Sequence, residues 1–487
     1  MVEYRAGQVV ELTTRDVAHG GWCVARTEDG PVVFVRHTLP GETVLARITE
    51  VTSHLARADA VDILTPSPDR VDPPCPHAHP GGCGGCDWQH ATLPAQRSLK
   101  AAVVRQQLKR LAGVDREVTV EPLPGDEEPG GERAGGEDAG PVSVTGTGAG
   151  LGWRTRVQFA VRADGVAGLR AHRSHDVIDV GQCLIAHPGI TDLGITGRRW
   201  PGTVSVEGLV AAGSGERAAV ITPGRARPKG RRPQASRSRS GATSPDPSGP
   251  LDTPGPPDLT EADSVLRRVG PSNRGLTPLR GHSYLSQRAA GRDWRVSVGA
   301  FWQVHPAAAD VLTGAILAAL APEPGDVALD LYCGAGLFAG SLARAVGPGG
   351  TVIGVEADSA AVRDARHNLR EWPWARVHKG DVAEVLSRGD QPGALPAARL
   401  VVADPPRAGL AREVIDYLGQ AGNGAARFAY VSCDPATLAR DIGLLSARGW
   451  TLDGLRAFDA FPMTHHVECV ATLSAPRPSA TEALPAP

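Results

Sequence analysis

The chain has 487 residues, which is enough for about three domains. Hydrophobic residues make up 41% of it, but 59 glycines and 41 prolines predict long loops or unfolded insertions beside the packed parts. The formal net charge of -2 excludes a protein that is basic throughout, so any surface for nucleic acid must come from a local concentration of Lys and Arg.

The N-terminal residues show no basic start followed by an apolar core, and no window of the chain reaches 18 uninterrupted apolar residues. We therefore expect a cytoplasmic monomer with no membrane partner. Residues 7–63 hold short alternating apolar runs broken by turns such as His19-Gly20-Gly21, a spacing typical of a small antiparallel barrel. Small barrels often bind oligonucleotides, although a solvated face is the commoner role of surface arginines like those found here.

Three cysteines, Cys75, Cys83 and Cys86, follow within twelve residues, and the glycine pairs between them let the backbone wrap closely around a small object. In a large intracellular chain such clustering favours a metal or catalysis over disulfides. Cys183, after a predicted strand, is the best placed fourth thiol. Four cysteines suit an iron-sulfur cluster or structural zinc, and the spacing does not separate the two. The alternative zinc ligands in this region are His77, His79 and His90.

Residues 91–113 carry apolar side chains at helical spacing and end at Gly113, which predicts an amphipathic helix. Its basic residues, Lys100 among them, are expected on a solvated face or against RNA phosphate. The next stretch, 122–150, is rich in Gly, Glu and Pro and predicts a disordered insertion.

Strands resume at Trp153 and alternate Arg with apolar residues, as in a sheet whose wet, basic face could serve as an RNA floor. A second insertion is expected at about 222–270. Its basic run between Arg225 and Arg239 contains no acid, and we interpret it either as an arm that binds RNA or as an inert linker.

The C-terminal part alternates apolar strands with helical segments, the signature of a doubly wound parallel sheet. Its turn at Gly334-Ala335-Gly336 fits G-x-G-x-x-A, with Glu356 placed to bind a ribose, so a NAD enzyme is a fair rival. Asp330 before this turn and Asp404 after a later strand instead resemble the arrangement of class I S-adenosylmethionine methyltransferases. Asp381 sits where that fold commonly contacts the adenine.

Cys433 ends a short apolar run, and Asp434-Pro435 stops that strand before a predicted helix whose start should favour a thiolate in part. The thiol is thereby presented at the sheet edge where ligands bind, although a lone cysteine is more often buried and structural. Carbon 5 of uracil needs such a thiol, because it becomes nucleophilic only after a thiolate adds to carbon 6. A base must then remove the hydrogen on carbon 5. Glu468, whose pKa its apolar neighbours should raise, is the candidate, unless it belongs to an ion pair.

The sequence AHGGWCVAR followed by LPGETVLARI resembles a TRAM domain, an RNA-binding module. The motifs VSCDPATLARD, DPPRAG, AFWQVHP and HHVEC resemble the RNA 5-methyluridine methyltransferases of the TrmA/RlmD type. The resemblance covers nearly everything except the two insertions and the tail after about 475, and it makes Cys433 the nucleophile and Glu468 the base. It also assigns residues to the cofactor and uracil sites, namely Gln303, Tyr332, Glu356, Asp381 and Asp404.

By the same resemblance the cluster ligands are Cys75, Cys83, Cys86 and Cys183, and a [4Fe-4S] cluster is favoured over zinc. Two departures from the family pattern stand out. His305 replaces the Asn that usually follows the Gln at a spacing of two, and the gap between the first two cysteines is longer than expected.

These observations predict a multidomain α/β protein. We expect an OB-like TRAM barrel at 1–64, a central α+β domain with the cluster at 65–295, a Rossmann-like methyltransferase at 296–475 and a disordered tail at 476–487. The predicted activity is S-adenosylmethionine-dependent methylation of carbon 5 of a flipped-out uridine, in 23S rRNA in preference to tRNA. The alternatives are a tRNA uridine-5 enzyme, a 5-methylcytosine enzyme, which should carry a Pro-Cys pair where this chain has Pro405-Pro406, and a noncatalytic RNA-binding iron-sulfur protein.

Overall fold

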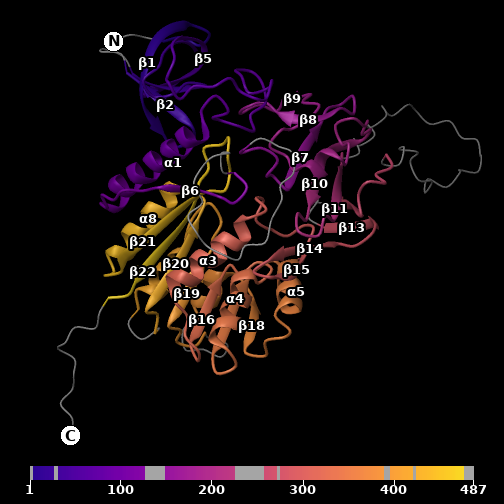
Figure 1. The fold of residues 1–487 in the computed structure, drawn as a ribbon, viewed down its shortest axis with the longest axis vertical. Coiled ribbons are helices and arrows are strands. Elements are labelled where there is room, and N and C mark those ends of the chain that lie inside the picture. Colours follow the sequence, from indigo (N-terminus) through magenta and orange to yellow (C-terminus); the bar gives the residue numbers. More distant parts are fainter. Residues whose placement is uncertain are drawn as a thin grey trace, which may run out of the picture.

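The computed structural model describes residues 4–26, 31–126, 149–224, 257–270, 275–388, 395–420 and 424–476. Most of the acidic insertion expected at 122–150, the basic run from Arg225 to Arg239 and nearly all of the expected tail lie outside these residues. Figure 1 shows a small barrel at the N-terminal end of the molecule, a central sheet beside it, and a large sheet flanked by helices that is formed mainly by the C-terminal part. The multidomain α/β fold is therefore confirmed.

The N-terminal barrel is closed in the order β1-β2-β3-β5-β4. Its pairings are antiparallel except that β3 and β5 run parallel. Along β4, buried and more exposed side chains alternate, so that Val44 and Ile48 fill the interior, as period-two patterning requires. The strands are β1 (Val9–Ala18), β2 (Trp22–Ala25), β3 (Val32–Arg36), β4 (Thr43–Val51) and β5 (Leu55–Thr65).

The helix predicted over 91–113 is present as α1 (Leu93–Gln107), followed by a single π-helical turn, η1 (Leu108–Ala112), and it ends at Gly113 with φ 68°. The expectation for Lys100 was wrong. Its side chain is fully buried, and its Nζ donates to Asp459 Oδ1 at 2.5 Å, because α1 is covered on that side by the catalytic part of the chain. A buried pair of this kind ties the two segments together, since removal of one partner leaves a buried charge alone.

The segment between the barrel and residue 296, expected to form one central domain, contributes to two of the sheets. Strand β6 (Val120–Pro122) pairs in parallel with β21 at the edge of the large sheet, and Figure 1 shows the two side by side. The rest forms a sheet in the order β13-β12-β11-β10-β7-β8-β9, together with the hairpin β14-β15 and a short helix. These elements are β7 (Arg156–Val161), β8 (Ala167–Arg170), β9 (Val177–Ile178), α2 (Pro188–Thr191), β10 (Thr203–Val210), β11 (Arg217–Pro223), β12 (Ser264–Val269), β13 (Gly275–Arg280), β14 (Tyr284–Ala289) and β15 (Arg292–Ser297).

The second predicted insertion ends earlier than residue 270. Strand β12 lies inside that range and pairs in parallel with β11, and its Val265 and Leu266 are buried. Three apolar residues flanked by arginines were too short a signal to distinguish from the polar stretch before them.

The large sheet has the order β18-β17-β16-β19-β20-β22-β21-β6. Strands β16 to β20 run parallel, whereas β22 returns antiparallel to β20. Its elements after α3 (Ala308–Leu320) are β16 (Val327–Leu331), α4 (Leu337–Val346), β17 (Thr351–Glu356), α5 (Ser359–Asn368), β18 (Ala375–Lys379), α6 (Val382–Leu386), β19 (Leu400–Ala403), α7 (Arg412–Leu418), β20 (Arg427–Ser432), α8 (Pro435–Ser446), β21 (Thr451–Asp459) and β22 (Glu468–Ser474).

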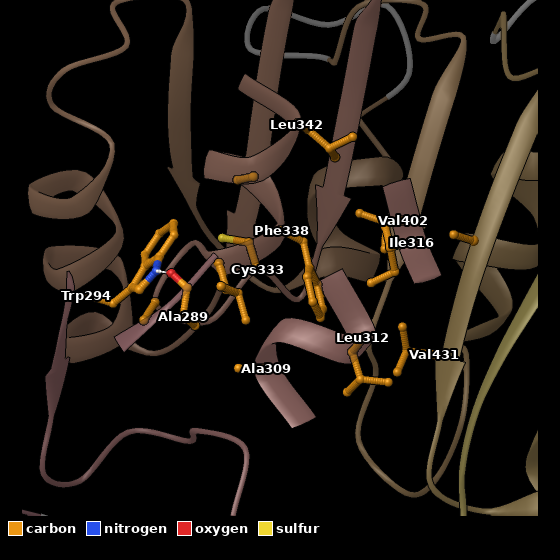
Figure 2. Close-up of a cluster of buried hydrophobic side chains, with 14 of the residues drawn as sticks. Ala289, Trp294, Ala309, Leu312, Ile316, Cys333, Phe338, Leu342, Val402 and Val431 are labelled. Atoms are coloured by element: carbon orange, nitrogen blue, oxygen red, sulfur yellow. Dashed lines mark hydrogen bonds between the residues drawn. The ribbon is translucent and has the colours of Figure 1, made fainter. Parts of the chain in front are cut away.

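Helices cover both faces of this sheet, which is why its strands read as continuous apolar runs. Figure 2 shows one of the two cores, where Leu312 and Ile316 of α3 lie against Val402 of β19 and Val431 of β20. Helices α6, α7 and α8, with α1, bury their apolar sides in the other core. Among the described residues, no helix is both long and apolar enough to cross a membrane.

Candidate active site and four-cysteine cavity

Cys433 lies at the turn between β20 and α8, where the sequence predicted it. Asp434 is the N-cap of α8, and its Oδ1 accepts hydrogen bonds from the backbone N–H groups of Ala436 and Thr437 at 3.0 and 2.9 Å. The first free donors of the helix are therefore occupied by this carboxylate. The predicted help of the helix start to a Cys433 thiolate is largely taken up by Asp434.

Strand pairing brings Glu468 opposite Cys433. Ser432 of β20 pairs with Cys469 of β22, so in this antiparallel ladder the next residue of one strand faces the preceding residue of the other. Glu468 is 4% exposed. Asp404 follows β19, the strand beside β20, and is buried close enough to Glu468 for the two charges to interact. The structure thus collects one thiol and two carboxyl groups at one edge of the sheet.

Burial dominates the electrostatics of this group. It raises the pKa of the Cys433 thiol to about 11, and the nearby Glu468 carboxylate acts in the same direction, while Arg407 opposes both through a side-chain hydrogen bond and its charge. Burial and their mutual repulsion raise the pKa of Glu468, and burial raises that of Asp404. The raised pKa expected for Glu468 is confirmed, and near neutral pH the two carboxyl groups favour sharing a proton over both being ionised.

Cys433 opens onto a cavity of about 140 Å³. Two of its walls come from distant parts of the chain. His19, from the turn between β1 and β2 of the barrel, has its Nε2 3.3 Å from Asp434 Oδ2. Arg407 has its Nη2 3.2 Å from His466 Nε2. The residues that line the cavity are His19, Arg407, Cys433, Asp434, Pro435, His465 and His466.

Sequence reasoning missed the roles of Arg407 and His19. Arg407 directly follows Asp404-Pro405-Pro406, so its place after a strand terminator at the ligand edge was a usable signal. No local signal marks His19, because only the docking of the barrel brings it to this cavity.

Four residues expected at the cofactor site lie at the carboxyl ends of neighbouring strands. Tyr332 follows β16 with φ 66°, Glu356 ends β17, Asp381 follows β18, and Asp404 follows β19. This is the edge at which open α/β sheets bind ligands.

The glycine turn of this edge is fixed by acids. Glu356 accepts a hydrogen bond from the Gly334 N–H at 3.0 Å, and Asp381 caps α6 through the N–H of Ala383. Asp330 is fully buried, and its Oδ1 has no hydrogen-bond partner, although Oδ2 accepts from the Ala339 N–H at 2.7 Å. A buried acceptor without a partner beside the ligand edge fits a bound group that donates hydrogen bonds.

Gln303 lies apart from these four residues, in a small cavity with Trp302, Thr155 and Leu285. His305, which departs from the family pattern, is buried and structural. Its Nδ1 accepts from the Ala307 N–H at 3.1 Å, and its Nε2 lies 2.9 Å from Asp126 Oδ2. His305 therefore anchors the loop before α3.

The four predicted cluster cysteines converge on another cavity, of about 450 Å³, which all of them line. The sulfur of Cys83 accepts from the Gly85 N–H at 3.4 Å, and that of Cys86 accepts from Gln89 Nε2 at 3.1 Å. Cys183 accepts from backbone N–H groups as well. Such donors stabilise thiolates that bind metal.

The loop around this cavity is tightly wrapped. A Cβ on Gly82 would lie 2.3 Å from the His77 carbonyl oxygen, and one on Gly84 would lie 2.6 Å from His172 Cα. Burial raises the pKa of Cys83 and Cys183, so these thiols favour a cationic group that would stabilise their ionised form. The donor set and the cavity therefore fit a cluster. In the part of the chain that the structure describes, no group of three or more His, Cys, Asp or Glu side chains is arranged around a single ion position.

The other histidines considered as zinc ligands lie in different surroundings. His90 is buried with its Nε2 3.3 Å from the Thr38 carbonyl oxygen, and exposed His79 contacts the carbonyl of Pro80 through Nδ1. His77 is the one of the three that lines the four-cysteine cavity.

Comparison with protein families gives three matches along the chain. Residues 4–61 match the TRAM domain, residues 296–386 match the protein-L-isoaspartate(D-aspartate) O-methyltransferase model, and residues 397–475 match the tRNA (uracil-5-)-methyltransferase model. The last of these contains Asp404, Arg407, Cys433 and Glu468.

Full-length relatives extend the match to the whole chain. A protein of Streptomyces coelicolor named as an uncharacterized RNA methyltransferase is 47% identical over 474 residues, covering 96% of this chain and 93% of the relative. One of Bifidobacterium longum with the same description is 32% identical and covers 95% of each. In fold, the chain is similar to the Pyrococcus abyssi tRNA (uracil-54, C5)-methyltransferase, with a TM-score of 0.63 at 21% identity over 95% of this chain and 100% of that one. The chain therefore belongs to the TrmA/RlmD-type family of RNA (uracil-5-)-methyltransferases.

Proposed function

We propose that this enzyme methylates carbon 5 of a uridine in RNA through a transient bond between Cys433 and carbon 6 of the base. The observation that carries this proposal is the register of β20 and β22, which sets the Cys433 thiol opposite the buried Glu468 beside a cavity. A thiol and a carboxyl group in this relation are the two groups that carbon-5 chemistry on uracil requires.

The first step is addition. The Cys433 sulfur, as thiolate, forms a bond to carbon 6, and the electron pair of the 5,6 double bond moves into an enolate at oxygen 4. Arg407, which contacts Cys433, lowers the cost of ionising the thiol. Carbon 5 then attacks the methyl group of S-adenosylmethionine, and the bond from that methyl to sulfur breaks.

The second step restores the ring. Glu468 takes the proton from carbon 5, the 5,6 double bond re-forms, and the carbon–sulfur bond to Cys433 breaks to return the thiolate. The raised pKa of Glu468, caused by burial and by Asp404, makes it a stronger base than an exposed carboxylate. Asp404 gives the released proton a second place to reside, because the two carboxyl groups interact.

Four residues at the carboxyl edge are proposed to hold S-adenosylmethionine, which supplies an electrophilic methyl group when bound. They are Tyr332, Glu356, Asp381 and Asp404, and Asp330 supports the glycine turn from below. Gln303 is proposed to contact the uracil from the loop before α3, where it lies 8% exposed.

The RNA must present its uridine unstacked, because stacking hides carbons 5 and 6. We propose 23S rRNA as the target in preference to tRNA, from the combination of a TRAM barrel with a four-cysteine cavity. The similarity to an archaeal protein named for tRNA supports the alternative target. Mapping 5-methyluridine in ribosomal and transfer RNA from cells without this protein separates the two.

Cys75, Cys83, Cys86 and Cys183 are proposed to hold a [4Fe-4S] cluster. Their sulfurs surround a cavity much larger than one ion, and N–H donors reach at least three of them. Protein purified without oxygen should be brown and contain iron and acid-labile sulfide. A colourless preparation loaded with zinc would refute the cluster.

The covalent step is tested with RNA that contains 5-fluorouridine, because fluorine at carbon 5 cannot leave as a proton. We expect a stable adduct of the protein with this RNA, mapped by mass spectrometry to Cys433. Absence of the adduct under conditions where ordinary RNA is methylated would contradict the mechanism.

A further inference from the structure

A second large cavity lies between the barrel and the cysteine loop. Its volume is about 470 Å³, within the range of small-molecule sites. Barrel strands form one side, the loop before Cys83 forms another, and the turn after β8 closes the third. The side chains that define it are Trp22, Arg36, Arg57, His172 and Arg173.

The walls have the chemistry of a nucleotide site. The guanidinium carbons of Arg36 and Arg57 lie 5.9 and 5.8 Å from the centre of the Trp22 ring, and the His172 ring meets Trp22 edge-on at 5.9 Å. Aromatic rings and guanidinium groups together bind the bases and phosphates of single-stranded nucleic acid. Among the described residues that line the cavity there is no Leu, Ile or Val, which argues against an apolar peptide as the occupant.

Two of the arginines are held ready by a single acid. Glu50 Oε2 lies 2.5 Å from Arg57 Nη1 and 3.2 Å from Arg173 Nη1. Glu50 is partly exposed, so a phosphate could take its place between the same two guanidinium groups.

The position of this cavity relates it to Cys433. The turn between β1 and β2 places His19 in the Cys433 cavity and Trp22 in the second one. Three residues span at most about 10 Å, so the two cavities lie within reach of neighbouring nucleotides of one strand. The turn is also firmly seated, since a Cβ on Gly21 would come within 3.0 Å of Asp87 and 3.1 Å of His465.

We propose that the Trp22 cavity binds one unpaired nucleotide of the substrate RNA, close in sequence to the methylated uridine, by stacking its base on Trp22 and pairing its phosphate with Arg57 and Arg173. This inference rests on the proposed function, because it takes the uridine at Cys433 as its reference point. It makes the barrel part of the substrate site, and it predicts that the enzyme recognises two unstacked nucleotides at once.

The test is a scan of abasic positions. A short fluorescein-labelled single-stranded RNA with one central uridine is prepared with a single abasic nucleotide at each position near that uridine, and the affinity of the whole protein for each is measured by anisotropy. We expect one position besides the uridine at which the loss of the base weakens binding about 5- to 150-fold, the range of a stacked base. In Trp22→Ala the effect at that position should disappear, and in Trp22→Phe it should largely return.

Glu50→Gln gives an independent readout. Removal of the acid frees both arginines, so RNA should bind more tightly and with a steeper dependence on salt. A role of Glu50 in folding alone would instead weaken binding. Leu64→Ala, an exposed apolar residue of the same barrel that does not line the cavity, is the matched control and should leave the scan unchanged.

The proposal is overturned if no position besides the uridine is sensitive, or if the sensitive position behaves the same in Trp22→Ala as in the unaltered protein. Failure of the proposed function is distinguished by the 5-fluorouridine adduct. Its absence would remove the methylation mechanism, whereas the abasic scan reports binding alone and stays interpretable.

Discussion

Cysteine occurs in two contrasting surroundings in this protein. At the Cys433 cavity one thiol faces two buried carboxyl groups and an arginine. At the four-cysteine cavity the thiols face one another, and their sulfurs accept hydrogen bonds from N–H groups. In the first, neighbouring groups provide for proton transfer and a single covalent bond. In the second, they provide only for negative sulfur, so the comparison shows that neighbours, and not the residue type, separate nucleophile from ligand.

The largest expected effect breaks the comparison at its catalytic side. Cys433→Ala should reduce methyl transfer by at least about 10⁴-fold, since the covalent route is removed, while RNA binding persists. Methylation is measured by transfer of radiolabelled methyl groups to RNA. Cys469→Ala, a buried cysteine one residue from Glu468, is the control and should stay active. Equal losses in both variants would show that cavity formation in the core, and not nucleophilicity, is responsible.

Glu468→Gln should have the next largest effect. Methyl transfer should still occur, but without the base the proton on carbon 5 stays, so turnover falls by about 10²- to 10⁴-fold and protein accumulates on ordinary RNA as a methylated adduct. Denaturing gels and mass spectrometry detect that adduct. Glu413→Gln, an exposed acid on α7, is the control. Release of 5-methyluridine at the unaltered rate by Glu468→Gln would assign the base elsewhere.

Arg407→Ala tests the electrostatic part. Because burial raises the pKa of Cys433 to about 11 and Arg407 opposes that rise, the variant should have less thiolate at every pH below 11. Each pKa unit corresponds to about 1.36 kcal/mol, so a further rise of one unit would slow adduct formation about tenfold.

The pH dependence has a definite sign. The reacting form is the thiolate, and its fraction increases with pH up to about 11, so the single-turnover rate should rise from pH 7 to 9 in both proteins with the variant below. Arg412→Ala is the control, since this exposed arginine pairs only with Asp416 on its own helix. A rate that is flat across this range would mean that RNA binding lowers the pKa of Cys433 to below 7.

The smallest effect on chemistry is expected at the other cavity. Cys183→Ser should lose iron and sulfide and lower the thermal midpoint by at least about 2–4 °C, the shift that accompanies 1 kcal/mol in a domain of 150 to 250 residues. Methylation per folded molecule should fall less than in any variant above, because the cavity is separate from Cys433. A complete loss of adduct formation with unchanged stability would give the cluster a catalytic role.

The sequence by itself determined those features that depend on local pattern or on short motifs. Alternation predicted the barrel, the apolar runs predicted the parallel strands, and the turn chemistry of Asp434-Pro435 placed Cys433 at a strand end. The cysteine spacing predicted a shared cavity, and all four thiols line it.

Only the tertiary structure decided which distant segments meet. Lys100, expected on a surface, is buried against Asp459, β6 joins the catalytic sheet, and His19 of the barrel reaches the Cys433 cavity. The pKa of Cys433 likewise follows from burial and from Glu468 across the ladder, and not from the helix start beside it in the chain. Local patterns fix which backbone shape a segment prefers, but docking between segments depends on matched surfaces hundreds of residues apart, which period and spacing do not record.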